Sequence, residues 1–171
     1  TQSLWGVWGT DASNVWAVGD GGTFLKWNGG MWSAQSSGTS ATFNSVWGAN
    51  ASNVWAVGTG GKIWKWDGTA WSQQANALRD LYGVWGTDAS NVWAVGESGT
   101  IVKWNGTAWS PPQSSGTNSR YSGVWGTNAS NVWAVGSGGT IVKWNGTAWS
   151  PQSSGTSDWL FGIWGTDASN V

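Results

Sequence analysis

Residues 85–109 read Trp-Gly-Thr-Asp-Ala-Ser-Asn-Val-Trp-Ala-Val-Gly-Glu-Ser-Gly-Thr-Ile-Val-Lys-Trp-Asn-Gly-Thr-Ala-Trp, and close copies of this run fill the rest of the chain. The Trp-Gly pair recurs at intervals of 39, 38, 40 and 39 residues, at Trp8, Trp47, Trp85, Trp125 and Trp164. A fixed period of about forty residues is typical of proteins built from stacked copies of one supersecondary unit.

Each copy contains four short runs that favour strands because they are rich in β-branched and aromatic residues. In the third copy these runs are 81–86, 91–96, 100–104 and 108–111. Asp, Ser, Asn and Gly lie between them, which is the composition of tight turns. Four short antiparallel strands at this period, without helical periodicity, predict an all-β fold: a β-propeller of four-stranded antiparallel blades.

The repeat divides a single propeller domain, residues 1–171, into four blades and one extra inner strand. The blades are expected at 4–42, 43–80, 81–120 and 121–159, with a partial fifth blade at 160–171. Because the last segment repeats the inner strand of the first blade, we expect a homo-oligomer, a dimer that shares one ring through its terminal strands. A monomeric four-bladed ring and a fragment of a longer propeller are the alternatives.

The quoted run also resembles a known group of proteins. It is similar to the tandem repeats of surface and secreted propeller proteins in myxobacteria and related bacteria, and more distantly to the Asp-box repeats of bacterial neuraminidases and photosystem assembly factors. The Asp-box pattern Ser-x-Asp-x-Gly-x-Thr-Trp is reduced to Asp67-Gly-Thr-Ala-Trp71, with Asn at the acidic position in the other copies. The resemblance implies the propeller fold and an extracellular or cell-surface location, but not the neuraminidase activity.

Composition narrows the function classes. The chain has no cysteine and no histidine, so thiolate nucleophiles, imidazole bases and most zinc or copper sites are excluded. Seven basic and eight acidic residues leave no basic stripe for a nucleic acid. No apolar run is long enough to span a bilayer, and the first residues of this sequence do not form a signal peptide. One carboxylate per turn argues against a metal site, and we expect no cofactor and no enzymatic activity.

Differences among the copies are concentrated in two connections, the turn between the second and third strands and the segment that leads to the next blade. In an antiparallel blade both connections lie on the same side, so one face of the propeller varies while the other is nearly constant. Loops on a rigid scaffold commonly carry binding; drift in solvated loops is the alternative. The candidate ligand-binding residues on this variable face are Asp20, Arg79, Asp80, Tyr82, Glu97, Arg120, Tyr121, Asp158 and Trp159.

The constant face offers a second set of candidates, in which a polar residue precedes a tryptophan in every copy. Identical shallow pockets would give a lectin avidity for sugars, which stack on aromatic rings and bond to Asn and Asp. The alternative is that Asp and Asn hold the turns while the indoles form the core. The pairs are Asn28 with Trp32, Asp67 with Trp71, Asn105 with Trp109, and Asn145 with Trp149.

Three functions follow from these patterns. A glycan-binding, lectin-like surface module is favoured. A protein-interaction platform that uses the variable face is the main alternative. A structural repeat without a ligand, natural or engineered, that assembles into a larger ring is the third.

Overall fold

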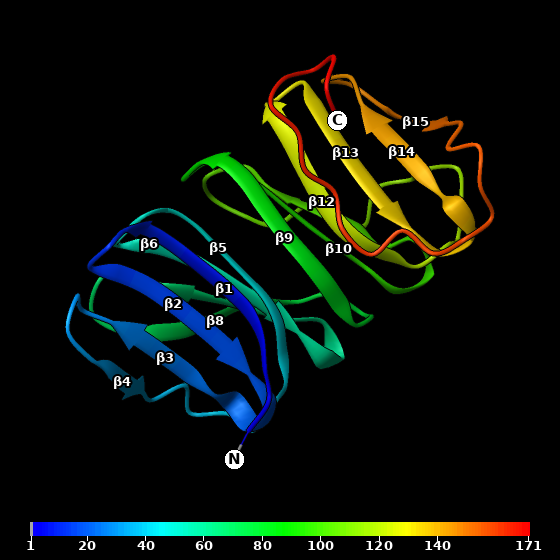
Figure 1. The fold of residues 1–171 in the computed structure, drawn as a ribbon. Coiled ribbons are helices and arrows are strands. Elements are labelled where there is room, and N and C mark those ends of the chain that lie inside the picture. Colours follow the sequence, from blue (N-terminus) through cyan, green and yellow to red (C-terminus); the bar gives the residue numbers. More distant parts are fainter. Residues whose placement is uncertain (1) are drawn as a thin grey trace. The chain divides into compact units, whose positions relative to one another are not determined.

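The computed structural model describes residues 2–171, which form antiparallel sheets joined by short turns (Figure 1). The chain divides after Leu81 into two compact units. Within every sheet each strand neighbours the next one along the chain, which is the strand order of a propeller blade. The predicted all-β class with antiparallel blades is therefore confirmed.

The first unit contains two four-stranded sheets. The first sheet consists of β1 (Leu4–Asp11), β2 (Asn14–Gly19), β3 (Phe24–Trp27) and β4 (Trp32–Gln35). The second sheet consists of β5 (Phe43–Asn50), β6 (Asn53–Gly58), β7 (Lys62–Trp66) and β8 (Trp71–Asn76).

The second unit contains the remaining sheets, and the first residue of the third sheet is the boundary residue Leu81. The third sheet consists of β9 (Leu81–Asp88), β10 (Asn91–Gly96) and β11 (Ile101–Trp104). The fourth sheet consists of β12 (Tyr121–Asn128), β13 (Asn131–Gly136), β14 (Ile141–Trp144) and β15 (Trp149–Gln152).

The third sheet lacks the fourth strand that the sequence predicts at 108–111. Only one bridge forms there, between Trp104 and Trp109. Pro111 and Pro112 follow directly, and because proline has no backbone N–H the ladder cannot continue through two of them. The segment stays attached through the N–H of Gln113, which donates to the carbonyl oxygen of Ile101 at 2.8 Å.

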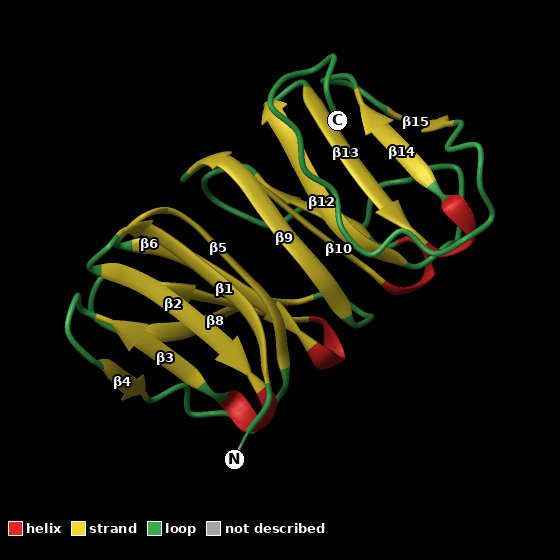
Figure 2. Ribbon diagram, in the orientation of Figure 1, coloured by secondary structure: helices red, strands yellow, loops and turns green. Residues whose placement is uncertain are grey.

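A short 3₁₀ turn joins the second and third strands of each sheet, at one end of that sheet (Figure 2). The backbone of this turn is hydrogen-bonded to the connection that leads into the first strand of the same sheet. In the fourth sheet, for example, the N–H of Ser137 donates to the carbonyl oxygen of Arg120 at 2.9 Å. The two variable connections therefore lie at the same end of a sheet, which we call the variable edge. The turns are η1 (Asp20–Gly22), η2 (Thr59–Gly61), η3 (Glu97–Gly99) and η4 (Ser137–Gly139).

Each sheet has two apolar faces, because side chains alternate across the strands. We call the face that carries Trp16, Val18 and Phe24 in the first sheet the front face, and the face that carries Leu4, Val7 and Trp32 the back face. Equivalent residues of the other sheets take the same names. Register pairs such as Val7 with Ala17 and Trp8 with Trp16 place these side chains on their respective faces.

In the first unit the front face of the first sheet packs on the back face of the second. Trp16 and Phe24 lie 5.1 and 4.3 Å from the ring centre of Trp71, and Phe24 lies 4.7 Å from that of Phe43. Burying an indole fully contributes about 4–6 kcal/mol as an upper bound, from roughly 150–250 Å² of surface. Tryptophan side chains are therefore the main component of this interface.

The second unit repeats this packing. The front face of the third sheet, Trp93, Val95 and Ile101, forms one buried cluster with the back face of the fourth, where Tyr121 and Trp149 lie. Lysine side chains cover several of the central indoles: the ammonium of Lys103 lies 4.7 Å from the ring centre of Trp93. This cation–π contact lets a charged residue lie against the indole at little cost.

Candidate functional site at the variable edge

Four of the predicted variable-face residues form one cluster in the second unit, which we call the Arg120 cluster: Tyr82, Glu97, Arg120 and Trp159. The guanidinium carbon of Arg120 lies 3.6 Å from the ring centre of Tyr82 and 5.3 Å from that of Trp159. Its Nη1 lies 3.7 Å from Oε1 of Glu97, which also accepts a hydrogen bond from the Tyr82 hydroxyl at 2.9 Å. Trp159 is 46% exposed. The cluster thus presents an aromatic surface beside a positive and a negative group.

The first unit has a related pair at the equivalent positions. The indole N–H of Trp5 donates to Oδ1 of Asp20 at 2.8 Å, and the Thr42 hydroxyl donates to the same oxygen at 3.1 Å. The Trp5 bond is the main reason that the pKa of Asp20 lies below its ordinary value. The acid of the 3₁₀ turn is therefore held by the aromatic residue of its own inner strand, as Glu97 is by Tyr82.

Other predicted residues of this face have structural contacts instead. Asp80 accepts the N–H of Gly60 at 2.7 Å and so secures η2. Asp158 bonds Thr156 within its own connection. Tyr121 is fully buried and donates its hydroxyl to Ser115 at 2.7 Å, and burial raises the pKa of this phenol. Arg79 is exposed.

At the opposite edge, the polar residue of each predicted repeated pocket closes a turn. Oδ1 of Asn105 accepts the N–H of Thr107 and of Ala108, each at 2.9 Å, and Asp67 and Asn145 make the same bonds in their sheets. Asn28 bonds Gly30 and Met31 in the same way.

The tryptophans of these pairs differ in access. Trp71 and Trp149 are buried between sheets, and Trp109 is partly buried. Trp32 is half-exposed on the back face of the first sheet. The repeated pairs therefore do not present four equivalent surfaces for a ligand.

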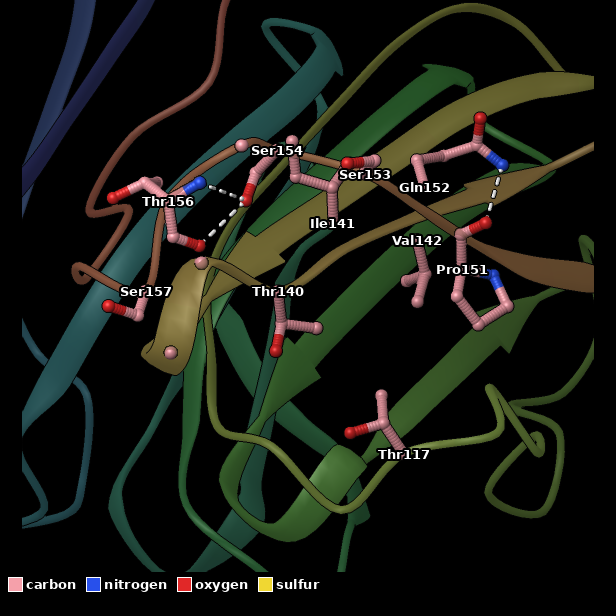
Figure 3. Close-up of a pocket in the computed structure, with 13 residues that line it drawn as sticks. Thr117, Thr140, Ile141, Val142, Pro151, Gln152, Ser153, Ser154, Thr156 and Ser157 are labelled. Atoms are coloured by element: carbon pink, nitrogen blue, oxygen red, sulfur yellow. Dashed lines mark hydrogen bonds between the residues drawn. The ribbon is translucent and has the colours of Figure 1, made fainter.

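The structure also holds a hollow at the variable edge that sequence reasoning missed. It has a volume of about 570 Å³ and lies between η4 with β14 and the connection after β15 (Figure 3). Ser153, Ser154, Thr156 and Ser157 line one side, and Thr140 and Ile141 the other. Ser154 is engaged with Thr156, accepting its N–H at 3.3 Å and donating to its carbonyl oxygen at 3.1 Å. We call this feature the hydroxyl hollow.

The third sheet has an equivalent hollow of about 430 Å³, between η3 and the connection that contains Ser114, Ser115 and Thr117. The sequence feature that the two hollows share is the run Gln-Ser-Ser-Gly-Thr, which begins at Gln113 and again at Gln152. A third copy begins at Gln35, while the second repeat departs from it. The repetition of a hydroxyl-rich run could have indicated a repeated polar site.

Asp11 and Asp88 in the first turns of the first and third sheets, and Asp167 in the matching turn of segment 160–171, bond to their own turns. Oδ1 of Asp11 accepts the N–H of Ser13 at 2.7 Å, and this bond is the main cause of its lowered pKa. The corresponding pKa values are lowered mainly by the Thr87 hydroxyl at Asp88 and by the Asn170 amide at Asp167. Among residues 2–171 no three acidic, histidine or cysteine side chains gather in a way that could hold a metal ion. The same stretch contains no helix long and apolar enough to cross a membrane.

Comparison with solved structures supports the propeller assignment. The chain matches a structure described as YCF48 bound to D1 peptide with a TM-score of 0.71 and 20% identity, over 95% of this chain and 59% of that one. It matches U3-55K and the RRP9 WD40 repeats, each with a TM-score of 0.70 and 11% identity, over 85% of this chain. The chain spans 49% and 48% of those two propellers. No family model and no curated protein matches the sequence.

The chain therefore has the fold of a partial propeller, about half to three-fifths the length of the propellers that it matches.

Proposed function

We propose that this chain is a non-catalytic glycan-binding module that acts outside the cell, and that its binding sites are the hydroxyl hollows of the variable edge. The observation that carries the proposal is the duplication of the hollow in the third and fourth sheets. Repeated weak sites on a rigid scaffold give avidity for a polymer of repeated sugars. The extracellular location rests on the resemblance to secreted bacterial propeller repeats.

The chemistry of the hollow suits a sugar. Serine and threonine hydroxyls both donate and accept hydrogen bonds, as sugar hydroxyls do, and Gln152 adds an amide. Sugars also stack on aromatic rings, and Trp159, two residues after Ser157 and 46% exposed, is the ring that this proposal assigns to that role. The absence of charge in the hollow itself favours neutral sugars.

A glycan array with the whole chain tests this proposal. We expect binding to a neutral oligosaccharide that falls when Ser153 and Ser157 are both replaced by Ala. Ser169→Ala is the matched control, because Ser169 is an exposed serine in a turn at the other edge of the repeat. No binding to any sugar at about millimolar concentration would refute the proposal, and equal binding by the double variant would exclude the hollow of the fourth sheet as a site.

Peptide binding is the second candidate, and the Arg120 cluster favours it. A guanidinium held against an aromatic ring is pre-oriented for a carboxylate, which it recognises through two parallel N–H donors. One of the matched propellers is described as bound to a peptide. Screening a library of peptides with acidic side chains and free C-terminal carboxylates would test this function. Binding that survives Arg120→Ala would exclude the cluster as its site.

We propose in addition that two copies of the chain share one ring of eight blades. The support is that the chain spans 59%, 49% and 48% of the three propellers that it matches. A single chain is 18.0 kDa, so a particle of twice that mass in solution is the expected result.

A further inference from the structure

The back face of the first sheet is apolar and uncovered. Val7 is 70% exposed and Trp32 46% exposed, whereas their equivalents in the second sheet, Val46 and Trp71, are only 6% and 7% exposed. With Leu4 and Ala17 they line a shallow hollow of about 280 Å³. An exposed apolar patch of this kind usually marks an interaction surface.

The structure also shows what covers such a face. The back face of the second sheet is covered by the front face of the first, through Trp16, Val18 and Phe24. The back face of the fourth sheet is covered by the front face of the third, through Trp93, Val95 and Ile101. The partner that fits the uncovered face is therefore a front face with a Trp-x-Val strand and a large apolar residue opposite it.

The fourth sheet has such a front face, formed by Trp133, Val135 and Ile141. Trp133 and Val135 are 7% and 3% exposed, and Ile141 is partly buried. The segment 160–171 crosses the fourth sheet, where the N–H of Leu160 donates to the carbonyl oxygen of Gly136 at 3.1 Å (Figure 1). An apolar cavity of about 370 Å³ remains between this segment and the three front-face residues. In the first unit, the equivalent space is filled by side chains of the second sheet such as Trp64 and Trp71.

The segment 160–171 has the place of an inner strand, but no strand within residues 2–171 pairs with it. It shows only the turn bridge between Asp167 and Asn170, and no ladder over the predicted strand 160–165. Its sequence equals that of residues 4–15 except at two positions, where Phe161 replaces Trp5 and Ile163 replaces Val7. The segment therefore carries nearly the same side chains as β1, in the order that β2 pairs with.

We infer that segment 160–171 of one copy pairs with β2 of a second copy, so that β2, β3 and β4 of that copy complete the unfinished sheet and its own β1 is displaced. The back face of the completed sheet, in which Leu160 and Ile163 take the places of Leu4 and Val7, then packs on the front face of the fourth sheet. Trp32 of the second copy fills the cavity beside Trp133 and Ile141, as Trp71 lies beside Trp16 and Phe24. This inference rests on the proposed sharing of a ring and names the surfaces that join the chains.

The interface joins two different faces of the same chain, so it is heterologous and generates either a closed ring or an open polymer. Exchanging β1 for segment 160–171 costs little free energy, because the incoming segment can pair with β2 in the same register and with almost the same side chains. The net gain is the burial of the open back face of the first sheet and the filling of the cavity beside Trp133.

Analytical sedimentation of the 171-residue chain and of single variants tests whether two copies associate through this surface. We expect the wild-type chain to associate and Trp32→Asp to weaken association by at least about a hundredfold, because it leaves an unpaired carboxylate in the interface. Leu78→Asp is the matched control, since Leu78 is the most exposed large apolar side chain and lies outside both faces. Circular dichroism verifies that each variant is folded.

Two results would overturn the inference: a wild-type mass of 18.0 kDa at every concentration, or association of Trp32→Asp equal to that of the wild type. Assemblies larger than two chains that Trp32→Asp dissociates would support the proposed surface and refute the two-chain ring.

Crosslinking distinguishes a contact between two chains from a contact within one chain. Because the chain has no cysteine, Trp32→Cys with Ile141→Cys creates a single pair that corresponds to Trp71 and Phe24, whose ring centres lie 4.3 Å apart. A short bis-maleimide reagent should yield a band of two chains on a denaturing gel. Crosslinks only within one chain would contradict the inference.

Discussion

The guanidinium of Arg120 lies flat against Tyr82, 3.6 Å from the centre of its ring, while the Tyr82 hydroxyl bonds the carboxylate of Glu97, which faces the same guanidinium. Three side chains from three different segments thus restrain one another. Arg120 lies in the connection before β12, Tyr82 in β9 and Glu97 in η3. The cluster therefore stabilises the variable edge as well as offering it a charged, aromatic surface.

We expect Arg120→Lys to destabilise the second unit by about 0.5–1 kcal/mol, because an ammonium cannot stack on the Tyr82 ring as a planar guanidinium does. Urea unfolding of the single variants Arg120→Lys and Tyr82→Leu and of the double variant measures the coupling. A coupling energy of zero would show that the stacking contributes nothing.

Asp67 provides a prediction about pH. Hydrogen bonds from the N–H of Ala70, then from the hydroxyl and N–H of Thr69, lower the pKa of Asp67 to about 2. Since the ordinary pKa is 3.8, folding is favoured by this group above pH 3.8, and the contribution disappears as the pH falls towards 2. Asp67→Asn places here the residue found in the other three copies, so its melting temperature should depend less on pH between 4 and 2. Equal acid sensitivity of both proteins would contradict the assigned cause.

Ser98 is a strained exception among the 3₁₀ turns. Its φ is 53°, in the left-handed region, where the other three turns have glycine at φ of 62°, 65° and 64°. We expect Ser98→Gly to stabilise the chain by about 0.5–1 kcal/mol, because glycine adopts this conformation without the steric cost. Gly138→Ser, the reverse change in the next turn, should destabilise by a similar amount. Thermal unfolding of both variants measures the pair, and shifts of the same sign would refute the explanation.

Gly139 marks the closest backbone approach at the variable edge. Its N–H donates to the carbonyl oxygen of Asp158 at 2.7 Å, and a Cβ at this position would overlap the carbonyl oxygen of Thr156. Gly155 also has a positive φ but open space around its Cα. Gly139→Ala should therefore cost about 1–3 kcal/mol more than Gly155→Ala in chemical denaturation. Equal costs would show that the connection moves aside freely.

Much of the fold could be predicted from the repeat, because the period, the strand propensities and the turn residues all agree. The missing fourth strand of the third sheet could have been anticipated from Pro111 and Pro112, which both lack the N–H that a ladder needs. Of the candidate site, the sequence indicated the variable connections and some of the residues that meet there. It did not indicate that Tyr121 is buried, because its neighbours in space come from another sheet.

The sequence by itself determined the blade: strands that alternate large apolar and small residues, joined by turns in which Asp, Asn and Gly satisfy local backbone groups, form the same sheet wherever they occur. Only the tertiary structure decided which faces are covered. Val7 and Val46 occupy the same place in their blades, yet one is exposed and the other buried. The physical reason is that burial depends on the neighbouring sheet, and no local pattern records whether that neighbour is present.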